Sequence, residues 1–338
     1  MSNKYNQPLV IHTVDTHTGG DPTRIVVSGL PPVPGETMLE KKKYLIENLD
    51  HIRTSLILEP RGHKDMFGAI LLEPTLPEAD IGVVFMDTSG YLNMCGHGTI
   101  GVTTAIIERQ IISYKSNDLV VLETPAGLVK VRATVNGNKV ENVSIQNVPG
   151  FLWEPNIALQ VPEVGNIMVD IAFGGNFYAF VDANELGLKI TPNNNEKFSD
   201  IGMKILNHVN KTVKVEHPLE KNINKVDLII FLDKSEEEGV DTQNVCVFGQ
   251  GQVARSACGT GLSAQMAKEN GKNLLNVGST FVTESIINTK FYGKVVEEVR
   301  VGDIPAIIPE VNGNAYVMGV HQFILHPEDP LKYGFLLK

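Results

Sequence analysis

The chain has 338 residues, 42% of them hydrophobic and 20% charged, which is typical of a soluble globular protein and not of a disordered one. Its 29 basic and 39 acidic residues give a formal net charge of −10. Because nucleic acids and anionic membranes attract clustered Lys and Arg, neither is expected as a partner. The length allows two domains of ordinary size, each with its own core.

The N-terminal residues 1–8 lack the apolar core of a secretory signal. The stretch 88–107 has no acidic or basic residue except His97, but its four glycines and its Ser, Asn and Thr residues make it too polar to span a membrane. We therefore expect a cytoplasmic protein. Three cysteines in such a chain do not form a disulfide framework, and Cys246 is expected to be a buried strand residue.

Apolar and β-branched runs predict strands throughout the chain, at 54–58, 81–86, 119–122, 143–146, 226–231, 245–248 and 281–284. Helices are predicted at about 99–109 and about 262–269. The first of these is apolar or small on nearly every side, which is typical of a helix that is buried all round. The segment 147–155 is predicted to cross between two halves of the chain, and 305–309 to carry it back.

One short phrase, Cys-Gly-x-Gly, occurs twice, beginning at Cys95 and at Cys258. Each copy follows a strand-like run and a glycine-rich turn, and each leads into a predicted helix. This echo predicts an α/β (α+β) fold with two pseudo-symmetric domains, each a strand-rich, barrel-like sheet around a central buried helix. Residues 1–150 with 308–338 would form the first domain, carrying Cys95, and 151–307 the second, carrying Cys258.

Two thiols that flank one carbon could remove a proton from one face and return it to the other, which inverts a stereocentre. A helix N-terminus lowers the pKa of a cysteine placed there, because unpaired amides and the helix dipole favour the thiolate. Glycines 96, 98, 259 and 261 let backbone N–H groups approach a carboxylate closely. Negative charge that spreads from the α-carbon would be stabilised by the same amides. This chemistry requires no cofactor and no metal.

Six segments of the chain closely resemble the proline racemase family, which includes proline racemase, 4-hydroxyproline 2-epimerase and trans-3-hydroxyproline dehydratase. The segments are 15–24, 59–63, 93–98, 173–176, 247–252 and 329–335. The resemblance covers essentially the whole chain, and Cys-Gly-His in this setting is highly specific. It implies an isomerase with an amino acid as its small-molecule substrate, a fold like that of diaminopimelate epimerase, and a homodimer.

The resemblance also assigns roles to individual positions. The two catalytic cysteines of the family fall on Cys95 and Cys258, and a second cysteine favours a racemase or epimerase over the dehydratase, where threonine is typical. Amides that bind the substrate carboxylate fall on Gly96, His97, Gly259 and Thr260. Phenylalanines that line the ring pocket match Phe67 and Phe248; such apolar walls favour proline over hydroxyproline, because a buried hydroxyl would lack a partner.

The chain departs from the family at Ala254, where the usual aspartate contacts the substrate ammonium, and at Ala257, where proline is usual. His97 is then the nearest named candidate to meet the amine. Four alternatives stay open beside a proline racemase: 4-hydroxyproline epimerisation, dehydration of 3-hydroxyproline, a racemase with an altered substrate, and a ligand-binding protein without turnover. For a group of further polar residues a structural role in turns is expected: His17, Arg24, Arg61, His63 and Asp65.

Overall fold

The computed structural model describes residues 7–113, 119–221 and 223–337. The chain divides into two compact units, one formed by Met1–Ser144 with Asn314–Lys338 and the other by Ile145–Gly313. The first boundary lies before the predicted residue 150, and the second lies after the predicted residue 307. Both segments that were expected to connect the two halves therefore belong to the second unit. There the backbone of Gly150 pairs with that of Ile307, and the Asn147 N–H donates to the Pro309 carbonyl at 2.9 Å.

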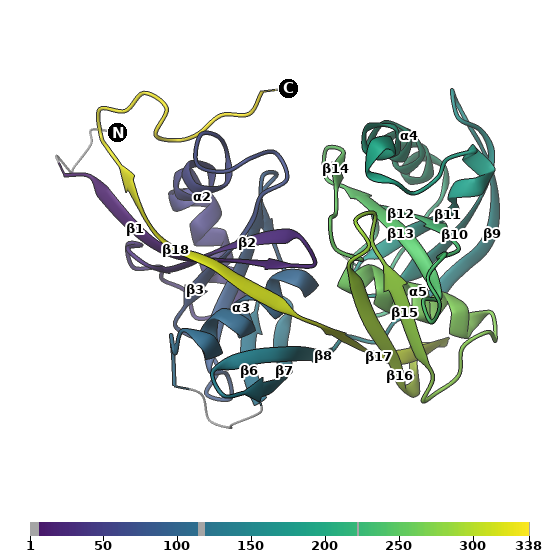
Figure 1. Cartoon of the computed structure of the whole chain (residues 1–338), viewed down its shortest axis with the longest axis horizontal. Helices are drawn as coiled ribbons and strands as arrows, with labels where there is room; N and C mark the ends of the chain where they lie inside the picture. Colours follow the sequence, from purple (N-terminus) through teal and green to yellow (C-terminus); the bar gives the residue numbers. More distant parts are fainter. Residues whose placement is uncertain (1–6, 114–118, 222, 338) are drawn as a thin grey trace. The chain divides into compact units, whose positions relative to one another are not determined.

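The described residues of the first unit form the strands β1 (Leu9–Thr18), β2 (Asp21–Ser28), β3 (Phe67–Leu72), β4 (Ile81–Asp87), β5 (Tyr91–Leu92), β6 (Leu119–Thr124), β7 (Gly127–Asn136), β8 (Lys139–Gln146), which runs past the boundary, and β18 (Ala315–Leu325). Pairing gives the order β18-β1-β2-β3-β4-β6-β7, in which β2–β3 and β4–β6 are parallel and the other pairs antiparallel. The last strand of the chain therefore completes the first unit by pairing with β1 (Figure 1).

The helices of the first unit are α1 (Met38–Tyr44), the short π-helix η1 (Leu45–Leu49), α2 (Asp50–Ile57) and α3 (Gly96–Glu108). Every residue of α3 from Gly98 to Ile107 is buried, which explains why the sequence of this helix has no polar face. The helix begins earlier than the predicted residue 99, because the glycines behind Cys95 form its first turn and do not precede it.

The predicted strand at 54–58 is wrong, since this segment lies in α2 and the residue that follows it. Leu45, Leu49, Ile52 and Leu56 are all buried in one hydrophobic cluster. Their spacing of three and four residues places them on one side of a helical segment. Packing of that side against the core outweighs the strand preference of the short apolar run itself.

The second unit contains β9 (Phe151–Val161), β10 (Gly165–Phe173), β11 (Phe177–Asp182), β12 (Val226–Asp233), β13 (Thr242–Phe248), β14 (Gln252–Val253), β15 (Thr280–Glu284), β16 (Lys290–Val301) and β17 (Ile304–Gly313). The predicted connections at 147–155 and 305–309 thus lie largely in β9 and β17. The order β9-β10-β11-β12-β13-β15-β16-β17 has parallel pairs at β11–β12 and β13–β15.

The two units repeat one pattern of strand directions. In each, an antiparallel hairpin is followed by a parallel, an antiparallel, a parallel and an antiparallel pair. A two-strand ribbon, β4–β5 or β13–β14, precedes each cysteine. The strand-rich α/β fold and its internal repeat, both predicted from the sequence, are confirmed.

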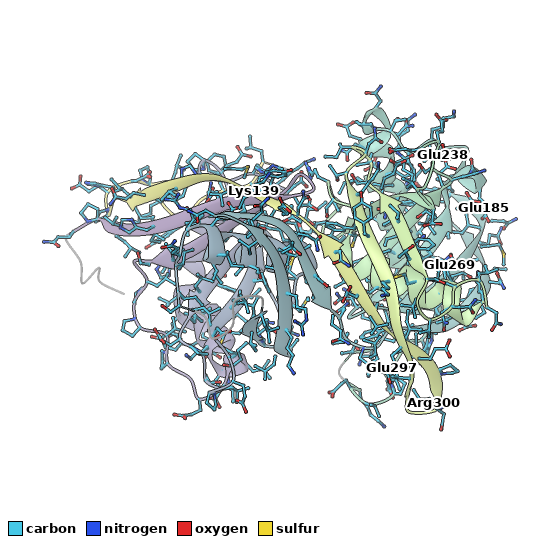
Figure 2. All side chains as sticks on the ribbon, turned by 60° about the horizontal axis from the view of Figure 1, so that its bottom comes forward. Lys139, Glu185, Glu238, Glu269, Glu297 and Arg300 are labelled. Carbon is cyan, nitrogen blue, oxygen red and sulfur yellow. The ribbon has the colours of Figure 1, made fainter. Side chains whose placement is uncertain are left out.

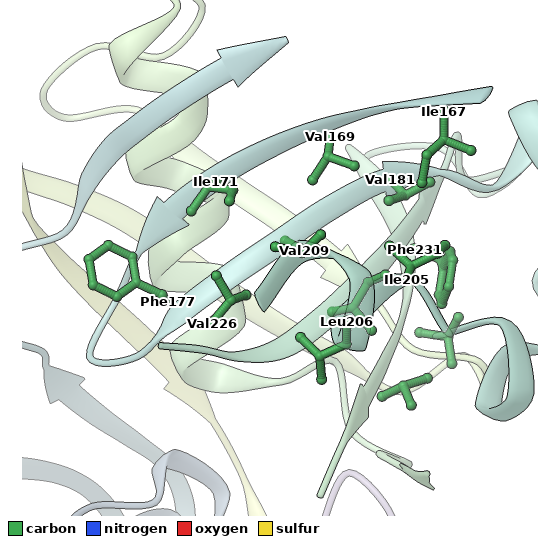
Figure 3. Packing of buried hydrophobic residues seen from close by; sticks show 14 of the residues in the cluster. Ile167, Val169, Ile171, Phe177, Val181, Ile205, Leu206, Val209, Val226 and Phe231 are labelled. Carbon is green, nitrogen blue, oxygen red and sulfur yellow. The ribbon is translucent and has the colours of Figure 1, made fainter. Parts of the chain in front are cut away.

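The remaining helices of the second unit are η2 (Ala183–Leu186), η3 (Pro192–Asn194), α4 (Asn195–Thr212) and α5 (Gly259–Gly271). Helix α4 places Ile205, Leu206 and Val209 in a hydrophobic cluster of this unit, against strand residues such as Val226 and Phe231 (Figure 3). On β16, buried and exposed residues alternate along its first half, and the charged Glu297 and Arg300 near its far end are exposed (Figure 2). Among the described residues, no helix is long and apolar enough to span a membrane.

Candidate active site

Cys95 directly precedes α3 in the first unit and acts as its N-cap residue. Its backbone is extended, with φ −145° and ψ 121°, and its carbonyl accepts the first helical hydrogen bond from the Thr99 N–H at 2.9 Å. The residue is 9% exposed, so the thiol is nearly enclosed. Its sulfur lies 3.4 Å from Nδ1 and 3.7 Å from Nε2 of His97.

His97 is held on two sides. The hydroxyl of Thr18 donates to its carbonyl at 2.9 Å, and its ring meets the Phe67 ring edge-on, with centroids 4.5 Å apart and planes at 89°. Burial lowers the pKa of His97, an effect that the negative charge of Asp21 opposes. A neutral imidazole has one donor and one acceptor nitrogen, so it can interact with the sulfur as a thiol or as a thiolate.

Cys258 occupies the equivalent position in the second unit, before α5, and its carbonyl accepts from the Leu262 N–H at 2.7 Å. Its φ is 58°, in the left-handed region that residues with a side chain rarely adopt. The preceding turn is held in place: the Ser256 hydroxyl accepts from the Cys258 N–H at 3.4 Å, and the Asn244 side-chain amide donates to the Ala257 carbonyl at 2.9 Å. Such strained residues cluster at functional sites.

In both units the glycine three residues after the cysteine makes room for the sulfur. A Cβ on Gly98 would lie 3.2 Å from the Cys95 sulfur and 2.8 Å from the Phe85 ring. A Cβ on Gly261 would lie 2.8 Å from the Cys258 sulfur. The second glycine of each Cys-Gly-x-Gly phrase is therefore required by the space that the thiol and a buried side chain, Phe85 or Ile230, occupy beside the first helical turn.

Tyr178 is a neighbour of Cys258 that the sequence did not single out. Its hydroxyl lies 2.6 Å from Oγ1 of Thr260 and 3.6 Å from the sulfur of Cys258. The side chain is completely buried, and burial together with the thiols of Cys258 and Cys246 raises the pKa of Tyr178 well above its ordinary value. A tyrosine in the apolar run of β11 has the pattern of a core residue, and the glycine-rich motif just before it was the only local signal.

Ala254 is 7% exposed and belongs to an apolar cluster that includes Tyr178 and Cys246. Phe248 and Cys258 pack against the same cluster and are only partly buried. Cys246 itself is fully buried on β13, as the sequence predicts. The position where the resemblance leads one to expect an aspartate is thus surrounded by largely apolar side chains.

The predicted site residues fall into two groups, one in each unit. The first unit brings together Cys95, Gly96, His97 and Phe67, and the second Cys258, Gly259, Thr260 and Phe248. No group of three or more His, Cys, Asp or Glu side chains suited to a metal ion occurs in the residues that the structure covers. The polar residues expected to be structural include Arg24, whose guanidinium makes a buried ion pair with Asp15 and donates to two carbonyls.

Solved structures of known proteins show to which class of protein this fold belongs. A probable proline racemase from Agrobacterium radiobacter matches with a TM-score of 0.88 at 34% identity, covering 97% of this chain and 96% of that one. A hydroxyproline epimerase from Agrobacterium vitis, solved with bound trans-4-hydroxy-L-proline, has the same TM-score and coverage at 31% identity. A PhzF-family protein from Bacillus anthracis shares the fold alone, at 15% identity and a TM-score of 0.63.

Sequence comparison then gives the family. The proline racemase family model matches residues 13–336. Proline racemase of Clostridioides difficile is 47% identical over 329 residues, which is 97% of this chain and 98% of that protein. A trans-3-hydroxy-L-proline dehydratase of Bacillus thuringiensis is 41% identical, with 97% and 98% covered. The chain belongs to the proline racemase family, and the expectation of an isomerase of this family is confirmed.

Proposed function

We propose that this protein is a cofactor-independent amino-acid racemase that inverts the α-carbon of proline. The observation that carries the proposal is the repeated arrangement of Cys95 and Cys258. Each cysteine directly precedes a buried helix whose first turn contains two glycines, and one such helix lies in each structural unit. The proline racemases that are 47% identical over nearly the whole chain support the same reaction.

In the proposed reaction one cysteine is a thiolate and the other a thiol. The thiolate removes the α-proton of the amino acid, and the thiol donates its proton to the opposite face of the same carbon. The enzyme then holds the reverse pair of protonation states, ready for the other enantiomer. This mechanism requires that the two sulfurs lie on opposite sides of the α-carbon when substrate is bound.

The substrate carboxylate is assigned to the first N–H groups of α3 and α5. These belong to Gly96, His97, Gly259 and Thr260, and the first N–H groups of a helix have no partner within it. Their orientation and the helix dipole favour an anion. As the α-proton leaves, negative charge moves toward the carboxylate, and the same amides stabilise it in the transition state.

Phe67 and Phe248 are assigned to the walls around the pyrrolidine ring. The Phe67 and His97 rings form a T-shaped pair, and Phe248 packs on the cluster that contains Ala254. Such walls suit an unsubstituted ring better than a hydroxylated one, because a buried hydroxyl without a partner is unfavourable. Cysteine at position 258, where the dehydratase is expected to have threonine, favours inversion over loss of water.

A cytoplasmic homodimer is also proposed. Support comes from the resemblance to the family and from an exposed apolar face on β18. Alternate residues of this strand, including Tyr316, Met318 and Val320, are about half exposed, at 48%, 54% and 57%. Apolar patches of this kind mark surfaces that associate.

The test is incubation with L-proline, trans-4-hydroxy-L-proline and trans-3-hydroxy-L-proline in D2O, followed by optical rotation and deuterium content at the α-carbon. The proposal predicts D-proline with deuterium at the α-carbon, formed faster than any product of the hydroxyprolines. Faster epimerisation of the 4-hydroxy compound would reassign the substrate. Loss of water from the 3-hydroxy compound would identify a dehydratase, and binding without exchange would identify a protein without turnover.

A further inference from the structure

Tyr178 connects two groups that the proposed reaction uses for different purposes. Its hydroxyl lies 3.6 Å from the sulfur of Cys258, the proposed acid and base, and 2.6 Å from the hydroxyl of Thr260, whose backbone N–H belongs to the proposed carboxylate clamp. Residue 178 is on β11, far from both in the sequence. The whole arrangement lies within the second unit.

We infer that Tyr178 is a positioning residue that holds Cys258 as a thiolate in the resting enzyme through a hydrogen-bonded chain from Thr260 to Tyr178 to the sulfur. In this chain the Thr260 hydroxyl donates to the phenol oxygen, and the phenol O–H donates to the thiolate. This inference rests on the proposed function only for its consequence in turnover. The hydrogen-bonded chain itself is defined by the distances from the Tyr178 hydroxyl to the Cys258 sulfur and to the Thr260 hydroxyl, and by the complete burial of Tyr178.

The phenol is suited to this task because it keeps its proton. Burial and the nearby thiols raise the pKa of Tyr178, so it stays an O–H donor at every pH at which the enzyme would work. The titratable groups that face it are Cys258 and, on β13, Cys246. The other elements packed there contribute apolar residues, among them Ala172 of β10, Ile230 of β12 and Ala264 of α5.

The hydrogen bonds between Thr260, Tyr178 and Cys258 can also reverse their direction. The sulfur therefore has a hydrogen-bond partner both as a thiolate and as a thiol. When the sulfur has taken the α-proton, its S–H can donate to the phenol oxygen, and the phenol can donate to Oγ1 of Thr260. Hydroxyl groups act as donor or acceptor by rotation alone, so no proton needs to move along the chain. An unsatisfied buried hydroxyl is thereby avoided in either half of the reaction.

Cys95 has a different neighbour, the imidazole of His97 at 3.4 Å. That ring can accept from a thiol as readily as it can donate to a thiolate. The two sulfurs therefore have different neighbours in the resting enzyme. At Cys258 the hydroxyl chain satisfies both protonation states but favours the charged form, because a hydrogen bond donated to a thiolate is stronger than one donated by a neutral thiol.

The test compares Tyr178→Phe with the parent protein by brief alkylation with iodoacetamide over a range of pH. Peptides that contain Cys95 and Cys258 are then quantified separately by mass spectrometry. Phenylalanine keeps the ring and removes only the O–H, so the pH midpoint for Cys258 should rise by about one unit, a tenfold loss of reactivity below it. The midpoint for Cys95 should not move, and Tyr292→Phe, at an exposed tyrosine of the same unit, should change neither.

Thr260→Val provides the second variant, because it removes the hydroxyl and keeps the backbone N–H of the clamp. The pH midpoint for alkylation of Cys258 should rise in this variant too, but by less. In the double variant Tyr178→Phe should raise the midpoint little further, because both hydroxyls belong to one hydrogen-bonded chain. If Tyr178→Phe does not fold, Thr260→Val is judged by the same criterion. An unchanged Cys258 midpoint, or an equal shift at Cys95, would overturn the inference.

Alkylation needs no substrate, so this result is independent of whether proline is turned over. In the active enzyme the acid limb of the kcat/KM profile for proline should move to higher pH in Tyr178→Phe, whereas a purely structural role would lower activity equally at every pH. A protein that fails the D2O test but shows the Cys258 shift would refute the proposed function and keep the hydroxyl chain.

Discussion

Gly261 leaves open the space that the Cys258 sulfur occupies: a Cβ at this position would lie 2.8 Å from that sulfur and 2.5 Å from Cδ1 of Ile230. Both distances are too short for a real Cβ, so an added methyl group would displace the Cys258 sulfur as well as the end of the buried Ile230 side chain. The positions of Cys258 and Gly261 at the start of α5 thus depend on each other sterically. The first prediction follows from this contact.

Gly261→Ala should displace the Cys258 thiol and reduce proline racemisation by at least tenfold. Overpacking should also lower the free energy of unfolding by about 1–3 kcal/mol. Racemisation measured by optical rotation and unfolding in urea will separate the two effects. Gly98→Ala, whose Cβ would lie 3.2 Å from the Cys95 sulfur, is the matched variant and should move its sulfur less. Normal turnover in Gly261→Ala would contradict the steric argument.

Replacing either catalytic candidate with serine should nearly abolish racemisation. Loss of a positioned acid or base typically lowers the rate of a reaction by about 10²–10⁴-fold. Cys95→Ser and Cys258→Ser should each reach this range. Cys246→Ala is the control: this third cysteine is fully buried on β13, so it should lose some stability and keep turnover. Equal loss of activity in all three variants would indicate a structural effect instead.

Ala254→Asp tests the departure from the family. In the free protein an aspartate here would be buried beside Tyr178 and Cys246, and it should lower stability by about 1–3 kcal/mol. If the carboxylate can reach the substrate amine, saturating proline should restore much of this loss and KM for proline should fall. Thermal unfolding with and without proline measures both. An equal loss of stability in the two conditions would show that the carboxylate does not contact substrate.

The depressed pKa of His97 predicts a change of stability with pH. Since burial disfavours its protonated form, the unfolded chain binds the proton more readily below its own pKa of about 6.5. Stability should therefore fall as pH drops below about 6.5, and His97→Gln should reduce this slope. Melting temperatures at pH 5–7 measure it, with exposed His326→Gln as the control. The same slope in His97→Gln and the parent would exclude His97 as a contributor.

Arg24 is expected to stabilise the first unit and not to take part in chemistry. Arg24→Leu leaves Asp15 buried without its partner, which costs about 3–5 kcal/mol in comparable buried pairs. Removal of Lys204 from its solvent-exposed pair with Glu163 should have little effect on stability. Urea unfolding compares the two. A small effect of Arg24→Leu would show that His321, 3.6 Å from Asp15, can replace the guanidinium.

Features that depend on short-range patterns could be predicted from the amino-acid sequence. The repeat at Cys95 and Cys258 predicted two similar halves, and the apolar runs predicted β4, β6, β8, β12, β13 and β15. The all-round apolar composition of the first helix predicted its burial. These predictions succeed because strand and helix periodicities, and the glycines that a crowded helix start requires, are local properties of the chain.

Contacts between residues that are distant in the sequence depend on how the whole chain folds. The segment 54–58 joined a helix because its apolar neighbours at helical spacing face the core. The predicted crossovers became strands because β9 pairs with β10 and β17 pairs with β16. The position of Tyr178 beside Cys258 depends on the order of β11, β12 and β13 in the sheet. Side-chain contacts between such strands are set by sheet order and register, which no local pattern encodes.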